Sequence, residues 1–324
     1  MKTFITGATG YIGNQLVKKL LEKDMHLHLL VRNPFSLAIP KHKNISIYKG
    51  DILNVTELTR AMQGCSHVYH CAAIARMSSH DRNKFFEVNV SGTQNVLDAA
   101  INTGVKKLVF TSSAAVFGPS LNIPLTEEDP RIEAFESDYD FAKHLAENLV
   151  REYVAHGLHT VIVNPSRVYG PGLQTYSNAV NRLIMQLMKK SFMLVPDVSQ
   201  YRGNYTFLDD VVHGHIKAME HGRAGENYIL GGENISNDVL ALTIKHFAAR
   251  SAKIIKCPSA ILKILIGISS PFTKDTDFNA AMIKRLHKHR MLCSDKAIAQ
   301  LGYNITPFET GIETTIKYLK NIHS

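Results

Sequence analysis

Short apolar runs alternate with longer amphipathic stretches through the first half of the chain. The runs have the length of buried strands, and the stretches between them carry apolar residues at helical spacing. We predict strands through Phe4 and Ile5 and over residues 26–31, 44–48, 67–71, 107–110 and 158–163. We predict helices over residues 11–22, 56–63, 82–103 and 139–153, and a loop over 119–138. This alternation is typical of an α/β protein with a right-handed, parallel, doubly wound sheet.

The strand and helix alternation weakens after the run NPSRVYGPG at residues 164–172. Short strands and further helices are predicted there, the helices over 178–190, 209–221, 236–250, 259–268, 276–288, 294–301 and 309–321. We therefore expect a Rossmann-type domain over residues 1–170. Residues 171–324 would mostly form a smaller, largely helical cap that binds substrate, with about 205–232 returning to the Rossmann core.

Composition and charge exclude several classes of protein. The chain has 324 residues, 45% of them hydrophobic, and a net charge of +9. No apolar run reaches the ~18 residues of a membrane span, and no secretory segment precedes the first strand. Lysine and arginine are dispersed rather than clustered, so nucleic acid is not an expected partner. The H-x-H pairs lack a matching third ligand, so no metal site is expected. Four cysteines without paired spacing favour a reducing, cytoplasmic location.

The first strand runs directly into a glycine-rich turn, TGATGYIG. Gly7 permits the tight turn, Gly10 lets backbone N–H groups approach a pyrophosphate, and Gly13 lets the next helix pack close to the sheet. The positive N-terminal end of that helix would face the phosphates. We predict a dinucleotide-binding turn, whose candidate contacts are Gly7, Thr9, Gly10, Tyr11, Ile12 and Gly13.

The residue after the second strand is expected to select the nucleotide. An NAD-preferring site places Asp or Glu there, whereas this chain has Arg32, whose guanidinium suits a 2′-phosphate. The alternative is a solvated arginine that opens a loop. NADP is therefore favoured over NAD. Further along, Asp51 ends the third strand and could accept from the adenine amino group. Further candidate contacts are Ile52, beside Asp51, and Ala72 and Ala73, which would let the chain pass beneath a ribose.

Three polar residues form the candidate catalytic set. Tyr139 and Lys143 lie four residues apart on one predicted helix and therefore share a face. The lysine would stabilise the phenolate of the tyrosine, and Ser113, at a strand end, could hydrogen-bond a substrate oxygen. These groups suit redox chemistry between an alcohol and a ketone. A YxxxK pair alone is usually structural. The prediction therefore depends on the order of the motifs along the chain: the glycine turn, the acid after the third strand, the serine at a strand end, and then YxxxK at the start of a helix. Asn89 lies inside a predicted helix, where asparagine is unfavourable, so its presence there requires an explanation.

The ordered motifs TGATGYIG, VFTSSAAVFG, YDFAK and NPSRVYGPG resemble the extended short-chain dehydrogenase/reductase superfamily, in its NAD-dependent epimerase/dehydratase group. The resemblance covers nearly the whole chain. It implies Ser113, Tyr139 and Lys143 as a catalytic triad, with Tyr139 as acid/base and Lys143 also on the nicotinamide ribose. It implies that Asn89 positions the lysine through water. It also implies that Pro165, Ser166 and Val168 flank the nicotinamide.

Two branches of the superfamily compete for this chain. Arg32, the apolar segment CPSAILKILIGISSPF and the C-terminal pattern look more like the dihydroflavonol reductase, 3β-hydroxysteroid dehydrogenase and aldehyde-reductase branch. This implies an NAD(P)-dependent oxidoreductase that interconverts a ketone or aldehyde and an alcohol of a small-molecule substrate, and a homodimer. The apolar segment could line a pocket for a hydrophobic carbonyl substrate, and packing between helices explains its residues equally well. The alternative is a nucleotide-sugar epimerase or dehydratase with tightly bound NAD. A remote alternative is a non-catalytic NADP-sensing module.

Overall fold

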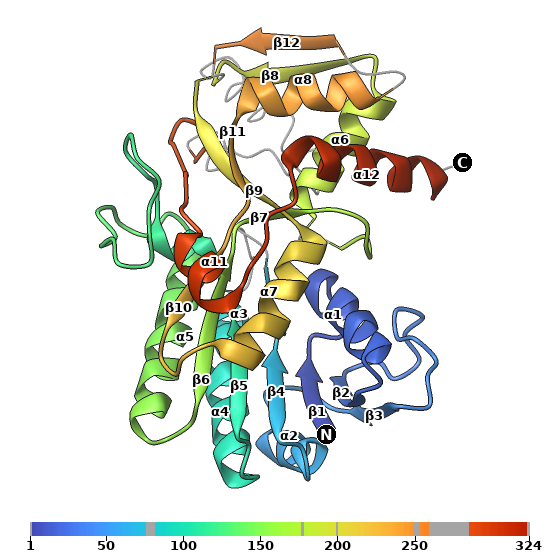
Figure 1. Ribbon diagram of the computed structural model, residues 1–324, viewed down its shortest axis with the longest axis vertical. Helices are drawn as coiled ribbons and strands as arrows, with labels where there is room; N and C mark the ends of the chain where they lie inside the picture. Colours follow the sequence, from blue (N-terminus) through green and yellow to red (C-terminus); the bar gives the residue numbers. More distant parts are fainter. Residues whose placement is uncertain are drawn as a thin grey trace.

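A seven-stranded parallel sheet forms the centre of the larger half of the molecule (Figure 1). The computed structural model describes residues 2–75, 82–175, 178–198, 200–248, 253–258 and 285–322. The strands follow the order β10-β6-β5-β4-β1-β2-β3, and every neighbouring pair is parallel. Their bounds are β1 Lys2–Thr6, β2 His26–Val31, β3 Ile45–Lys49, β4 His67–His70, β5 Lys107–Thr111, β6 Thr160–Pro165 and β10 Asn227–Leu230. The predicted doubly wound sheet is confirmed.

Helices cover both faces of this sheet. One face carries α1 (Tyr11–Glu22), α7 (Leu208–His221) and α11 (Asp295–Leu301), and the other carries α2 (Val55–Met62), α4 (Gly92–Asn102) and α5 (Asp138–Ala155). Successive residues of a strand point to opposite faces, so in β1 Ile5 packs toward α1 and Phe4 toward the other layer. Because both faces are buried, the strands read as continuous apolar runs.

The predicted helix over 82–103 is confirmed up to Asn102, but it is not a regular α-helix. It consists of α3 (Arg82–Phe86), a π-helical turn over Glu87–Ser91, and α4. The π-helical turn contains Asn89, whose side chain is buried. Its Nδ2 donates to the carbonyl of Ile74 and its Oδ1 accepts from the N–H of Ile74, at 3.1 and 2.8 Å. The Asn89 side chain therefore makes with the backbone of Ile74, after β4, the pair of hydrogen bonds that a neighbouring strand would make.

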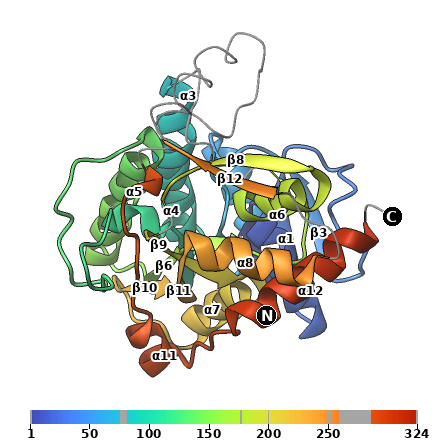
Figure 2. The same cartoon turned by 90° about the horizontal axis from the view of Figure 1, so that it is seen from above.

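The smaller half is helical, with two short sheets. Among the described residues its helices are α6 (Ala179–Lys189), α8 (Asn237–Phe247) and α12 (Phe308–Asn321), and α8 and α12 lie side by side (Figure 2). β8 (Phe192–Pro196) pairs with β12 (Lys253–Cys257), while β9 (Arg202–Phe207) lies between β7 (Arg167–Tyr169) and β11 (Glu233–Ser236). The predicted helix over 236–250 ends at Phe247.

Two of the helices predicted for the cap lie largely outside the residues that the structure describes. The predicted helix over 259–268 lies outside the described residues, as does 276–288 up to residue 284. Arg285 and Leu286 are helical, but the chain then turns before a bridge at His289 and Arg290, so this helix does not reach residue 288. Bridges from His289 to Ser120 and from Arg290 to Gly203 place the segment 289–293 between the loop at Ser120 and β9. This connection brings the C-terminal segment to the mouth of the large sheet.

Candidate active site

A cavity of about 880 Å³ lies at the carboxyl ends of the parallel strands, between the large sheet and the cap. This is the edge at which open α/β sheets bind ligands. Residues from three distant motifs meet on its wall. They are Gly7, Gly10, Tyr11, Ile12 and Gly13 from the glycine turn, Ala73, Ser113, Tyr139 and Lys143 from the centre, and Pro165, Ser166 and Val168 after β6.

The glycine turn has no room for side chains. Gly7 has a φ of +77°, and a Cβ on Gly13 would lie 2.2 Å from the carbonyl oxygen of Gly7. Gly10 begins α1 without a side-chain cap, so its first turn presents backbone N–H groups at the cavity. Uncapped N–H groups and the helix dipole together bind anions.

Tyr139 lies in the first turn of α5, which begins at Ser137, its N-cap. Burial raises the pKa of the Tyr139 phenol, and a hydrogen bond with the Ser113 side chain partly opposes that shift. The phenol is therefore protonated at neutral pH and ready to donate. Ser113 itself caps the 3₁₀ turn Ala114–Phe117 after β5, with its Oγ accepting from the N–H of Ala115 at 3.2 Å.

Lys143 lies one turn beyond Tyr139 and is 3% exposed. Its Nζ donates to the carbonyl of Thr111 at 2.8 Å and lies 4.8 Å from the centre of the Phe110 ring. Burial lowers the pKa of Lys143 to about 8, although Cys71 and Glu147 oppose that shift. The ammonium is thus held at the end of β5 in an environment that makes its proton easier to lose.

A buried carboxylate holds this arrangement together. Glu147 accepts from Ser112 Oγ at 2.6 Å and from Asn164 Nδ2 at 2.7 Å through Oε1. Through Oε2 it accepts from Asn227 Nδ2 at 3.1 Å and pairs with Arg151 at 3.2 Å. Glu147 therefore connects α5 to β5, β6 and β10 directly behind the candidate catalytic residues.

The comparisons with known proteins agree with this geometry. The family model of the NAD-dependent epimerase/dehydratase family matches residues 3–231. The chain belongs to this family. A putative dihydroflavonol 4-reductase of Synechocystis is 32% identical over 72% of this chain and 68% of its own length. Cinnamoyl-CoA reductase 1 of Petunia hybrida is 28% identical over 98% and 91%. Relatives and family together make the chain an NAD(P)-dependent oxidoreductase of the extended short-chain dehydrogenase/reductase type.

Solved structures show the same fold over the whole chain. The UDP-glucose 4-epimerase of Thermotoga maritima superposes with a TM-score of 0.83 at 21% identity and covers all of both chains. The family whose model matches is NAD-dependent. The residues present fit a nicotinamide dinucleotide, because Gly7, Gly10 and Gly13 line the cavity and the start of α1 has no side-chain cap. Ser166 Oγ, on the cavity wall, is also buried without a partner among the described residues.

Six predicted residues do not line the cavity, namely Thr9, Arg32, Asp51, Ile52, Ala72 and Asn89. Arg32 is exposed at the end of β2. Asp51 accepts from the N–H of Leu53 at 3.1 Å, and its own N–H donates to Glu57. The Ile52 side chain packs in the core near Gly92, where a Cβ would meet it. Asp51, Ile52 and Asn89 thus also make structural contacts within the protein.

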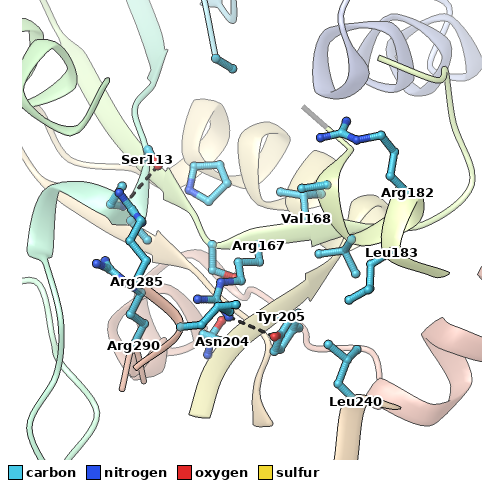
Figure 3. A pocket seen from close by; sticks show the side chains of 18 of the residues that line it. Ser113, Arg167, Val168, Arg182, Leu183, Asn204, Tyr205, Leu240, Arg285 and Arg290 are labelled. Atoms are coloured by element: carbon cyan, nitrogen blue, oxygen red, sulfur yellow. Dashed lines mark hydrogen bonds between the residues drawn. The ribbon is translucent and has the colours of Figure 1, made fainter. Parts of the chain in front are cut away.

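Several cavity residues escaped the sequence analysis. Arg167, Arg285 and Arg290 line it, as do Asn204 and Tyr205 (Figure 3). Arg167 stands inside the motif NPSRVYGPG and could have been noticed there. The others come from β9 and from the segment after residue 284, and only the fold brings them to the site. Thr111 and Cys71 also meet beside Lys143, with Thr111 Oγ1 donating to Cys71 Sγ at 3.3 Å.

The lowered pKa of Lys143 predicts a pH-dependent stability. Between pH 8 and the ordinary value of 10.5 the unfolded chain binds the proton more tightly, so the free energy of unfolding rises with pH. Relative to Lys143→Met, the wild-type protein should gain about 3 kcal/mol between pH 7 and pH 10.5. Urea unfolding without cofactor at several pH values measures this. Exposed Lys18→Met is the control, and a Lys143→Met difference that stays constant with pH contradicts the prediction.

Proposed function

We propose that this oxidoreductase converts a ketone or aldehyde into an alcohol, with Ser113, Tyr139 and Lys143 as its catalytic residues. The observation that carries the proposal is that Ser113, Tyr139 and Lys143 meet on the wall of one cavity, where the Tyr139 phenol is hydrogen-bonded to Ser113. A proton donor is needed at a carbonyl oxygen when its carbon accepts a hydride. A bound nicotinamide cofactor supplies that hydride.

Ser113, Tyr139 and Lys143 have separate roles in this reduction. Ser113 donates a hydrogen bond to the carbonyl oxygen and orients it toward Tyr139. Tyr139 gives its proton to that oxygen as the C=O bond becomes a C–O single bond, which completes the alcohol. Lys143 carries positive charge below about pH 8 and favours the phenolate that Tyr139 leaves behind. Asn89 keeps the chain after β4 in place through Ile74.

The cofactor contacts form the second part of the proposal. The glycine turn and its backbone, Gly7, Thr9, Gly10, Tyr11, Ile12 and Gly13, would hold the pyrophosphate, while Asp51 and Ile52 would lie at the adenine and Ala72 and Ala73 at the ribose. Pro165, Ser166 and Val168 would flank the nicotinamide, with Lys143 and Tyr139 at its ribose. The free hydroxyl of Ser166 supports this assignment. It makes residues 1–170 the cofactor domain and 171–324 mostly the substrate cap.

NADP is the proposed nucleotide, because Arg32 stands at the end of β2 with an exposed guanidinium. A 2′-phosphate accepts charge-assisted hydrogen bonds from such a group. The proposal also places the protein in the cytoplasm, in keeping with its four unpaired cysteines. Within the part of the chain that the structure describes, no helix is long and apolar enough to cross a membrane.

A homodimer is the proposed assembly. Phe141, Leu145 and Leu149 follow one another at four-residue spacing on α5, and none of them is fully buried. Phe141 is 40% exposed and also contacts Phe86 and Phe135. An apolar stripe of this kind suits a second helix pair across a two-fold axis.

Tyr139→Phe should lower kcat by about 10²–10⁴-fold, because the proton donor is lost while the ring remains. Binding of NADPH, followed by fluorescence titration, should stay near normal. Tyr48→Phe, on strand β3, is the matched control and should retain activity. An unchanged kcat in Tyr139→Phe would remove this residue from the mechanism.

Arg32→Asp should shift the preference from NADP to NAD. The carboxylate repels a 2′-phosphate and accepts from a ribose hydroxyl instead. The measurement is the ratio of kcat/KM for NADPH and NADH, expected to fall at least about 10-fold, the cost of one charge-assisted contact. Arg60→Asp makes the same charge change on an exposed residue of α2 and should leave the ratio unchanged. A constant ratio in Arg32→Asp would show that Arg32 does not read the phosphate.

Multi-angle light scattering should give twice the mass of the 36.1 kDa chain. Leu145→Glu places a charge in the apolar stripe and should shift the species toward the monomer. Glu152→Gln, at an exposed position of α5, is the control. A monomer mass for the unmodified protein excludes the proposed dimer.

A further inference from the structure

The substrate end of the cavity combines charged and apolar side chains. Figure 3 shows Arg285 below Ser113 and Arg290 below Arg285, with Arg167 and Asn204 nearby. Leu183 and Leu240 lie at the opposite side of the same view, where Arg182 is also found. Such a wall suits a ligand with one anionic end and one apolar end.

The arginines stand next to the proposed proton donor. Arg285 donates to Asp140 at 2.9 Å, and Asp140 follows Tyr139 in α5. The positive charge of Arg285 is close enough to act on the Tyr139 phenol. Arg290, which is 8% exposed, pairs with Glu136, as does Arg285. An anion bound among these groups is therefore adjacent to the reacting carbonyl.

Arg167 differs from the other two arginines because it has no carboxylate partner among the described residues. Its Nη1 donates to the Tyr205 hydroxyl at 3.0 Å, and its guanidinium lies 5.3 Å from the centre of that ring. It also rests on Gly203, where a Cβ would lie 2.0 Å from Nη1. The group is thus held in one orientation on the cavity wall and keeps donors free for a ligand.

The local charges do not cancel. Within the described residues, the positive side chains of Arg131, Arg285, Arg290 and Lys288 lie among the carboxylates of Glu133, Glu136 and Asp140, and the charge of Arg167 acts on Arg290. Positive charges therefore outnumber negative ones in this cluster. In addition, Arg290 Nε is buried without a partner in the described residues. Buried cations need compensation, and a carboxylate, which matches the planar fork of a guanidinium, supplies it.

We propose that the substrate is an amphipathic oxo acid, whose carboxylate binds Arg167 and Arg290 and whose apolar chain lies against Leu183 and Leu240. This inference rests on the proposed carbonyl reduction and specifies its substrate class. The chemistry is unchanged: the ketone carbon takes a hydride from the reduced nicotinamide, and its oxygen takes the proton of Tyr139. The carboxylate takes no part beyond binding.

The test compares acids with their methyl esters. Initial rates with 2-oxooctanoate, 4-oxooctanoate and both esters, each with NADPH and with NADH, give kcat/KM. At least one acid should exceed its ester by about 10-fold or more, the effect of a charge-assisted hydrogen bond. Arg167→Met should lower kcat/KM more for the acid than for its ester, and so remove most of that preference. Arg182→Met, elsewhere on the wall, is the matched control and should keep the preference.

Binding provides a readout that is independent of turnover. Calorimetry with octanoate, which has no ketone, should show binding to the wild-type protein and at least 10-fold weaker binding to Arg167→Met, with octanamide weak in both. Arg167→Lys retains the charge without the planar fork and should fall between the two. Circular dichroism shows whether Arg167→Met is folded. If it is not, Arg167→Lys takes its place in the binding comparison.

The outcomes separate the two proposals. Equal rates for acids and esters would overturn the carboxylate site and leave carbonyl reduction standing, as would an acid preference that survives in Arg167→Met. No turnover of any acid, ester or neutral ketone would overturn the proposed function, while octanoate binding still decides the anion site. Conversion of UDP-glucose without net cofactor oxidation would overturn the oxo-acid assignment together with the reductase.

Discussion

The buried carboxylate of Glu147 is the interaction on which the geometry of the active site depends. It accepts hydrogen bonds from Ser112 on one side and from Asn164 and Asn227 on the other. These partners lie at the ends of three neighbouring strands, whereas Glu147 lies one turn after Lys143 in α5. A buried carboxylate without these donors would be strongly unfavourable, so the network fixes the helix against the strand ends. Ser113, Tyr139 and Lys143 are placed by that fixation.

The same burial that holds the site also sets its protonation. Tyr139 is kept neutral because its phenolate would lose solvation, and Lys143 loses its proton more easily for the same reason. His70, behind the site, is hydrogen-bonded to Thr6 and Thr93, and burial lowers its pKa to about 3. A neutral imidazole therefore adds no charge beside Lys143. The charges that remain belong to the arginines on the substrate side of the cavity.

Arg167, Arg285 and Arg290 make the substrate side of the cavity more polar than the sequence predicts. The apolar stretch after residue 257 favours a hydrophobic carbonyl substrate, and most of it lies outside the described residues. The described wall contains Leu183 and Leu240, but it also contains Arg167, Arg285 and Arg290. Both properties fit an amphipathic molecule. The apolar prediction therefore accounts for only one side of the substrate space.

Local patterns in the sequence determined the large sheet, the glycine turn and the Tyr139–Lys143 pair. Strand periodicity, glycine at 7, 10 and 13, and four-residue spacing on a helix are all properties of neighbouring residues, which is why they can be read directly. They did not reveal the π-helical turn at Asn89, whose side chain contacts Ile74, 15 residues away. Nor could they show that Glu147 connects three strands, since its partners are spread from Ser112 to Asn227.

The substrate side was decided by tertiary structure alone. Arg167 follows β6, whereas Arg285 and Arg290 come more than a hundred residues later, and the bridge between His289 and Ser120 brings them to the cavity. No local spacing encodes that meeting, because it depends on how the C-terminal segment crosses the end of the sheet. The sequence by itself determined the parallel sheet, the glycine turn and the helix face that Tyr139 and Lys143 share. The fold decided which charges face the substrate.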